Sequence, residues 1–215
     1  MKLGELKIAT LMMIFPDEKF EIDFENDEQV SESLFALKSD SNYNAFLTAI
    51  PQALNRCFSS LEQKNVIPTK QMELSSTKGE GVGNRLRFRI SEVVPDMGKL
   101  EKISFYNTQE YIYLDACSYS RESTDSILLE QANGTFVIVY TPQIKRITAT
   151  TGDNHMIDLP RYITDIIPYF LKSELLRVEN PDEASIARNI YEQMVEETVN
   201  SQDGYQGQVQ VVYGI

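Results

Sequence analysis

The apolar residues of this chain change their spacing twice, and these changes constrain the fold more than any other feature. Residues 1–66 and 152–203 carry apolar side chains at helical spacing, whereas residues 67–151 alternate them at every second position. The first spacing is typical of helices with a buried face and the second of half-buried strands. We predict an α+β fold: a helical bundle made of the two outer segments, with an inserted antiparallel β-sandwich or barrel-like domain.

Prolines and polar caps set the expected limits of the helices in the first segment. A short amphipathic helix should end at Pro16. A second helix is expected over residues 28–38 and a longer one over residues 41–63. Pro51 lies inside the apolar stripe of that longer helix, so we expect either a kink there or a helix that begins at this proline.

The third segment contains two further helix starts. Asp158 is expected to cap a helix whose first turn contains Pro160, and Pro168 predicts a kink or an unwound turn farther along. Asn180 and Glu183 form the pattern of a capping box, in which each side chain accepts the backbone N–H of the other. This last helix should end near Ser201, followed by an extended arm over residues 204–215.

Six strands are predicted in the middle segment, over residues 72–75, 85–90, 100–106, 111–119, 127–132 and 136–140. The dipeptide Asn133-Gly134 predicts a hairpin between the last two. Arg85, Arg87 and Arg89 alternate with apolar residues and therefore share one face of a strand. This arginine row either meets an acidic surface on a neighbouring copy or partner, or belongs to a solvated sheet face.

The charge balance disfavours a nucleic-acid-binding face. The chain has 32 acidic and 20 basic residues and a formal net charge of -12, which repels phosphate. No apolar run approaches the ~20 residues that span a bilayer, so we expect no membrane segment. Cys57 and Cys117 lie in segments of different type and have no metal-site spacing, which favours buried thiols in a protein made in a reducing cytoplasm.

Catalytic patterns are weak throughout the chain. The glycine cluster at residues 79–83 lacks the Gly-Lys-Ser/Thr ending of a phosphate loop. His155 is the only histidine, and Asp153 and Asp158 lack the alternation of a calcium-binding loop. We therefore expect a protein that is not an enzyme, with no catalytic residue, no metal site and no cofactor.

Two stretches resemble a known family. The first carries NYNAFL at residues 42–47 and ALNRCF at 53–58; the second carries IDLP at 157–160, IIPYFLKSEL at 166–175, NPDEA at 180–184 and ARNIYE at 187–192. Together they resemble the head–tail adaptor (connector, or neck) proteins of tailed bacteriophages and cover roughly half the chain. The inserted β-domain departs from the compact all-helical adaptors, although larger members of the group contain one.

The resemblance implies a structural virion protein of the neck, made in the host cytoplasm. It implies a homo-oligomeric ring, usually of twelve copies, that binds the portal protein and the tail or neck proteins. DNA would pass through this ring during ejection without sequence-specific binding, as an acidic wall permits.

The end of the chain is the predicted contact with the portal or a neighbouring subunit. Its residues have the composition of a strand that can add to another sheet: Gln208, Val209, Gln210, Val211, Val212 and Tyr213. Two alternatives stay open. One is another virion ring component, a tail-completion or tail-terminator protein. The other is a carbohydrate-binding β-domain that uses exposed tyrosines: Tyr106, Tyr111, Tyr113 and Tyr119.

Overall fold

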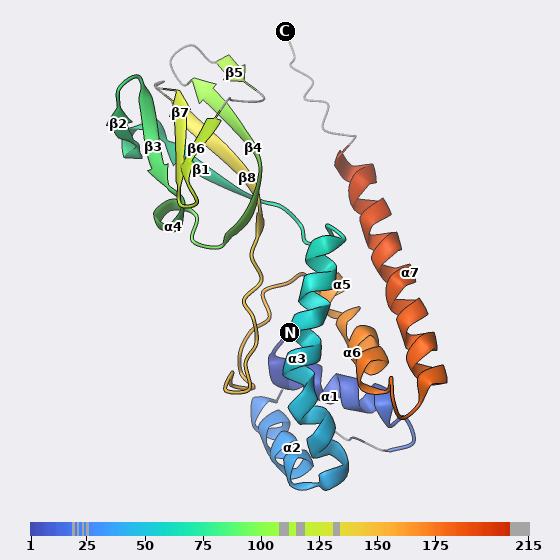
Figure 1. Ribbon diagram of the computed structural model, residues 1–215. Helices are drawn as coiled ribbons and strands as arrows, with labels where there is room; N and C mark the ends of the chain where they lie inside the picture. Colours follow the sequence, from blue (N-terminus) through green and yellow to red (C-terminus); the bar gives the residue numbers. More distant parts are fainter. Residues whose placement is uncertain are drawn as a thin grey trace. The chain divides into compact units, whose positions relative to one another are not determined.

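The computed structural model of the chain is a mixed α+β fold (Figure 1). It describes residues 1–18, 20, 22, 24, 26–107, 112–114, 119–130 and 134–206. The chain divides into two compact units. One is a helical unit of Met1–Val66 with Arg146–Ile215, and the other is a β unit of Ile67–Lys145.

The helical unit is assembled from both ends of the chain. Its helices are α1 (Leu3–Ile14), α2 (Asp27–Ser39), α3 (Ser41–Gln63), α5 (Arg161–Thr164), α6 (Ile167–Leu175) and α7 (Pro181–Gln206). Helix α6 contacts α1 and α3 from the first segment and α7 from the last, so it joins the two halves of the unit (Figure 1).

Helix α1 differs from the amphipathic helix that its sequence predicts. Its buried positions cover more than half of its circumference: Leu3, Gly4, Leu6, Lys7, Ile8, Thr10, Leu11 and Ile14. The reason is its position, because α2, α3 and α6 all contact it. Only the side with Glu5, Ala9, Met12 and Met13 stays partly exposed, and three of these four residues are apolar, so the helix lacks a polar face.

A loop from the third segment caps the start of α1. The backbone N–H groups of Leu3 and Gly4 donate to the carbonyls of His155 (2.9 Å) and Asp153 (2.8 Å). These are amides that a helix cannot pair within itself. A Cβ atom on Gly4 would lie 2.9 Å from Leu34 Cδ1, so glycine permits this close approach.

The two internal prolines have different consequences. Helix α3 begins at Ser41, where Asp40 accepts the N–H of Asn42 (2.8 Å), and it continues past Pro51 to the predicted end. A helix start at Pro51 is therefore wrong. Pro168 lies at the beginning of α6, where the missing N–H costs little, and a non-helical step separates α5 from α6. Pro160, rather than the predicted Asp158, precedes α5.

Only half of the predicted capping box forms at α7. Asn180 Oδ1 accepts the N–H of Glu183 (3.3 Å), but the N–H of Asn180 donates to the Leu176 carbonyl (2.8 Å). The Glu183 carboxylate instead pairs with Lys172 of α6 (2.9 Å). Helix α7 also continues to Gln206, which includes residues 204–206 of the predicted arm.

The β unit contains two four-stranded antiparallel sheets. One has the strand order β1-β8-β4-β5 and the other β2-β3-β7-β6. The strands are β1 (Lys70–Ser75), β2 (Glu80–Val82), β3 (Arg85–Arg89), β4 (Met97–Asn107), β5 (Ile112–Leu114), β6 (Tyr119–Ser123), β7 (Ser126–Glu130) and β8 (Thr135–Pro142). The short helices η1 (Ser76–Lys78) and α4 (Ile90–Val93) connect them. Among the described residues the sheets do not close into a barrel.

Side chains from both sheets share one hydrophobic core. Phe88 of β3 and Phe136 of β8 meet edge to face with ring centroids 5.9 Å apart, and Phe105 of β4 packs on Phe136 at 4.9 Å. Aromatic pairs at this separation add to the free energy of burial. The core therefore depends on both sheets at once.

The predicted hairpin at Asn133-Gly134 is wrong. Strand β7 pairs with β3 and β6, whereas β8 pairs with β1 and β4, so the two strands belong to different sheets. Asn133 lies outside the described residues. Gly134 has another role, because a Cβ atom there would lie 2.2 Å from the Tyr106 carbonyl oxygen. The glycine is required for the close approach of two backbones.

Candidate interaction surfaces

The arginine row lies on β3 in the second sheet, and its central member is held within the molecule. Arg87 donates from Nε and Nη2 to the two carboxylate oxygens of Glu122 on β6, both at 2.6 Å, and from Nη1 to Glu80 at 3.3 Å. The hydrogen bonds with Glu122 raise the pKa of Arg87 and lower the pKa of the Glu122 carboxyl. This planar fork is the strongest geometry that arginine offers a carboxylate.

The outer members of the row are more exposed. Arg85 donates to the Ser120 hydroxyl (2.8 Å), and Glu130 lies opposite it in the strand register. Arg89 donates to Glu92 (3.2 Å) with 61% of its side chain exposed. The sheet face is therefore mixed in charge. A contact with an acidic partner, if it forms, would use Arg85 and Arg89, while Arg87 stays paired within the sheet.

The other predicted contact, residues 208–213, lies outside the described residues. Tyr106 is half-buried on β4 of one sheet, and Tyr119 is exposed on β6 of the other. The remaining tyrosines proposed for sugar binding are outside the description, Tyr111 entirely and Tyr113 in its side chain. Tyr106 and Tyr113 are opposite each other in the register of β4 and β5, so the backbone brings these two positions together on one sheet, while Tyr119 lies on the other sheet.

Asp153, considered above as a possible calcium ligand, is paired with two lysines. Its carboxylate accepts from Lys7 Nζ (2.6 Å) and Lys38 Nζ (2.7 Å). Burial opposes its ionisation, but the hydrogen bonds and charges of the two lysines outweigh that effect, so its pKa is lowered. No group of three or more potential metal ligands occurs among the described residues.

Tyr191 anchors α7 to the rest of the helical unit. Its side chain is fully buried, its hydroxyl lies 2.9 Å from Ser60 Oγ on α3, and its ring meets Phe170 of α6 edge to face at 5.0 Å. Arg188 covers both rings, with its guanidinium 4.8 Å and 5.2 Å from their centroids. Lys64 and Arg188 both pair with Glu192. Burial raises the pKa of Tyr191.

Cys57 is a buried free thiol on α3, as its place in the apolar stripe predicts, and burial raises its pKa. Cys117 lies outside the described residues. A buried thiol with a raised pKa is a poor nucleophile. Cys57 is therefore part of the packing.

Several large apolar side chains of the helical unit face solvent. They include Val178 (90%), Phe35 (75%), Ile186 (60%) and Ile190 (37%). Ile186 and Ile190 are one turn apart on α7, about 100° around the helix from buried Ala187 and Tyr191. The sequence contains this signal, because the two isoleucines lie outside the apolar stripe of this helix, which contains Ala184, Ala187, Tyr191 and Val195.

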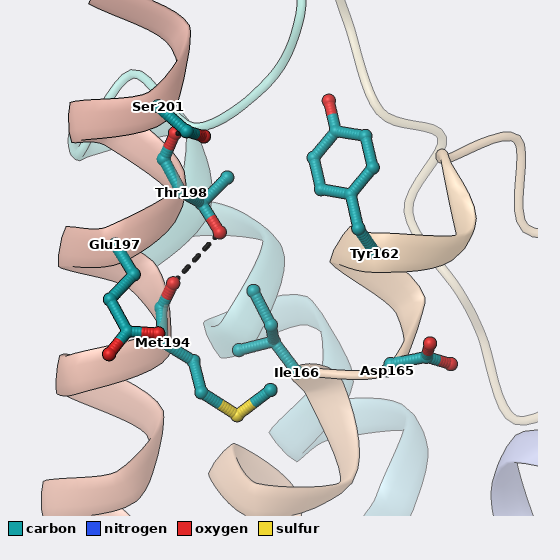
Figure 2. Close-up of a pocket in the computed structure, with 7 residues that line it drawn as sticks. All are labelled: Tyr162, Asp165, Ile166, Met194, Glu197, Thr198 and Ser201. Atoms are coloured by element: carbon teal, nitrogen blue, oxygen red, sulfur yellow. Dashed lines mark hydrogen bonds between the residues drawn. The ribbon is translucent and has the colours of Figure 1, made fainter.

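An open cleft of about 410 Å³ lies between α5 and α7 within the helical unit (Figure 2). Its lining residues come from two segments: Tyr162, Asp165, Ile166, Met194, Glu197, Thr198 and Ser201. The hydroxyls of Thr198 and Ser201 donate to carbonyls of their own helix, each at 2.8 Å. No sequence pattern marks this cleft, since its two walls are about 30 residues apart in the chain.

Comparison with known proteins yields no match to a family model and none to a curated protein sequence. In the part of the chain that the structure describes, no helix is both long enough and apolar enough to span a bilayer.

Proposed function

We propose that this chain is a head–tail adaptor of a tailed bacteriophage: a virion neck protein that forms a ring, of about twelve copies in the family it resembles, between portal and tail. We further propose that its helical unit is the bundle of such adaptors and its β unit an inserted sandwich. The observation that carries the proposal is that both stretches with the resemblance, residues 42–58 and 157–192, belong to one compact unit.

The place where the chain returns to the helical unit supports an insertion. Asn55 of α3 holds Ile147 through two hydrogen bonds, from Asn55 Nδ2 to the Ile147 carbonyl (2.7 Å) and from the Ile147 N–H to Asn55 Oδ1 (2.9 Å). Arg146 donates to the Asn55 carbonyl (3.1 Å) and pairs with Glu62 (2.6 Å). These bonds draw residues 146–151 into the helical unit, although their sequence suggests the β segment.

The contacts of Arg146 and Ile147 with α3 fit an insertion, because the chain also leaves the helical unit just after α3, at Val66. The segment therefore leaves and returns along one helix. Insertions are tolerated where the two ends are held close together, since the host domain then keeps its own core.

The charge of α7 fits a conduit that does not retain DNA. The helix carries acidic residues along its length: Asp182, Glu183, Glu192, Glu196, Glu197 and Asp203. Arg188 is its only basic residue, and that guanidinium is engaged with Glu192 and two aromatic rings. A surface without free cations releases no counterions from DNA and so binds it weakly.

The test is a mass measurement of the full chain alone and with the portal protein of the same virus. We expect a monomer of 24.6 kDa in isolation and, on the portal, an added mass of about twelve subunits. Absence of binding to portal-bearing heads would contradict the proposal. Binding to tails alone would favour the tail-terminator alternative.

A further inference from the structure

The cleft between α5 and α7 has an apolar floor and two facing walls. Figure 2 shows Ile166 and Met194 at the bottom, with Tyr162 on one side and Thr198 and Ser201 on the other. The Asp165 and Glu197 side chains point away from the space between these walls (Figure 2). An apolar occupant would therefore cover the floor without removing either carboxylate from water.

The volume of the cleft suits two or three side chains. A cavity of ~150 Å³ holds one benzene-sized group, and this cleft measures about 410 Å³. Tyr162 is 47% exposed at its mouth. Covering such apolar surface is favourable by ~25 cal/mol per Å².

The end of the chain is within reach. Helix α7 contributes Met194 and Ser201 to the cleft and ends at Gln206. At ~1.5 Å of rise per residue, its end is ~8 Å beyond Ser201 and ~18 Å beyond Met194. Residues 207–215 follow, and nine extended residues span ~30 Å. They suffice to turn back and follow the cleft over its whole length.

The composition of these nine residues fits the cleft. The first is Gly207, the residue type that most often reverses the chain after a helix. None of the nine carries a charged side chain. In an extended segment, Val209, Val211 and Tyr213 share one side, which provides three apolar side chains for an apolar floor.

We propose that residues 207–215 fold back onto the cleft of their own chain and cover it in the free subunit. The covalent link to α7 favours the chain's own segment over that of a second copy, because a short connection gives an effective concentration in the mM range. The segment is thus a latch, released when it binds elsewhere. The inference does not rest on the adaptor assignment, but in such a ring it would keep free subunits from using the segment before they meet the portal.

Disulfide trapping in the full chain tests the latch. We would introduce cysteine pairs Thr198→Cys with Val211→Cys, and Asn200→Cys with Val211→Cys as a control, all with Cys117→Ser. Asn200 is closer to Val211 in sequence but ~200° around the helix from Thr198. A disulfide needs Cα atoms about 4.4–6.8 Å apart. A latch predicts at least tenfold faster formation of the monomeric Thr198–Val211 bond than of the control bond.

Equal rates in the two pairs would overturn the latch, because an untethered segment would favour the nearer cysteine. A dimer-sized product from the Thr198 pair would overturn the choice of occupant in favour of a second copy. Ser201→Cys replaces Thr198→Cys if the latter loses its helical circular dichroism. Adding Val211→Asp to a Val209→Cys version of the pair should slow trapping by a similar factor. Each outcome is independent of binding to the portal.

Discussion

The two units of this chain differ in the side chains that they expose at their surfaces. In the β unit, Arg87 on the outer face of one sheet is paired with Glu122 of the same sheet. In the helical unit, large apolar side chains such as Val178 and Ile186 face solvent, and a cleft lies open beside α7. Exposed apolar surface is typical of contact with a partner. We therefore expect the helical unit to make the main contacts with other molecules.

The largest effect on the free energy of unfolding is expected at Tyr191, which anchors α7. Tyr191→Ala removes a fully buried ring between α3 and α6, and such truncations cost ~3–5 kcal/mol. Urea denaturation followed by circular dichroism measures the loss. Tyr191→Phe is the control, since it keeps the ring and loses only the hydrogen bond to Ser60, at ~1 kcal/mol. A small effect of Tyr191→Ala would mean that α7 is held by other contacts.

The second largest loss of stability is expected at Gly134, where two backbones of the β unit approach closely. Gly134→Ala would place a Cβ atom 2.2 Å from the Tyr106 carbonyl oxygen, and strain of this kind costs ~2–3 kcal/mol. Gly81→Ala is a matched control, because nothing lies within 4 Å of a Cβ atom there. Thermal unfolding of the two variants separates them. A neutral Gly134→Ala would show that the strands beside it shift easily.

A smaller, pH-dependent loss is expected at the Lys7–Asp153–Lys38 cluster. Asp153→Asn leaves the nearly buried Lys7 without its partner, which should cost ~2 kcal/mol after allowance for partial exposure. The pKa of Asp153 is lowered on folding, so its stabilisation is present above the ordinary aspartate pKa of ~4 and disappears as pH falls through the lower folded value.

The measurement is the free energy of unfolding of wild type and Asp153→Asn at pH 7 and at pH 3. Their difference should shrink at the lower pH. Asp165→Asn is the control, since this exposed carboxylate lies 3.9 Å from Arg161 and its loss should change stability by less than ~0.5 kcal/mol. A difference that does not depend on pH would contradict the pairing.

The smallest effect on stability is expected at Ile186 and Ile190, where the effect on assembly should be large. Replacing Ile186 and Ile190 together by serine alters exposed positions of α7, so stability should change by less than ~0.5 kcal/mol. If the helical unit makes the main contacts, the added mass on the portal should fall at least tenfold. Met72→Ser, an exposed apolar position on β1, is the control in the β unit. The reverse result would break the comparison between the units.

Much of the local structure follows from residues close together in sequence. Helix α3 has its predicted limits because Asp40 caps its first turn and an apolar stripe continues past Pro51. The separation of α5 from α6 likewise agrees with the unwound turn expected at Pro168. The arginine row on β3 was evident from its alternation, but its pairing with Glu122 on β6 was not, because 35 residues separate the two side chains. The cleft was missed for the same reason.

By itself, the sequence determined where most helices and strands begin and end, because caps, prolines and apolar periods act over a few residues. Tertiary structure decided which elements meet. It placed β7 and β8 in different sheets despite the turn signal between them, and it buried most of the circumference of α1, including Lys7 and Thr10. It also paired the Glu183 carboxylate with Lys172 and not with the Asn180 N–H. These choices depend on contacts between residues far apart in the chain, which no local pattern records.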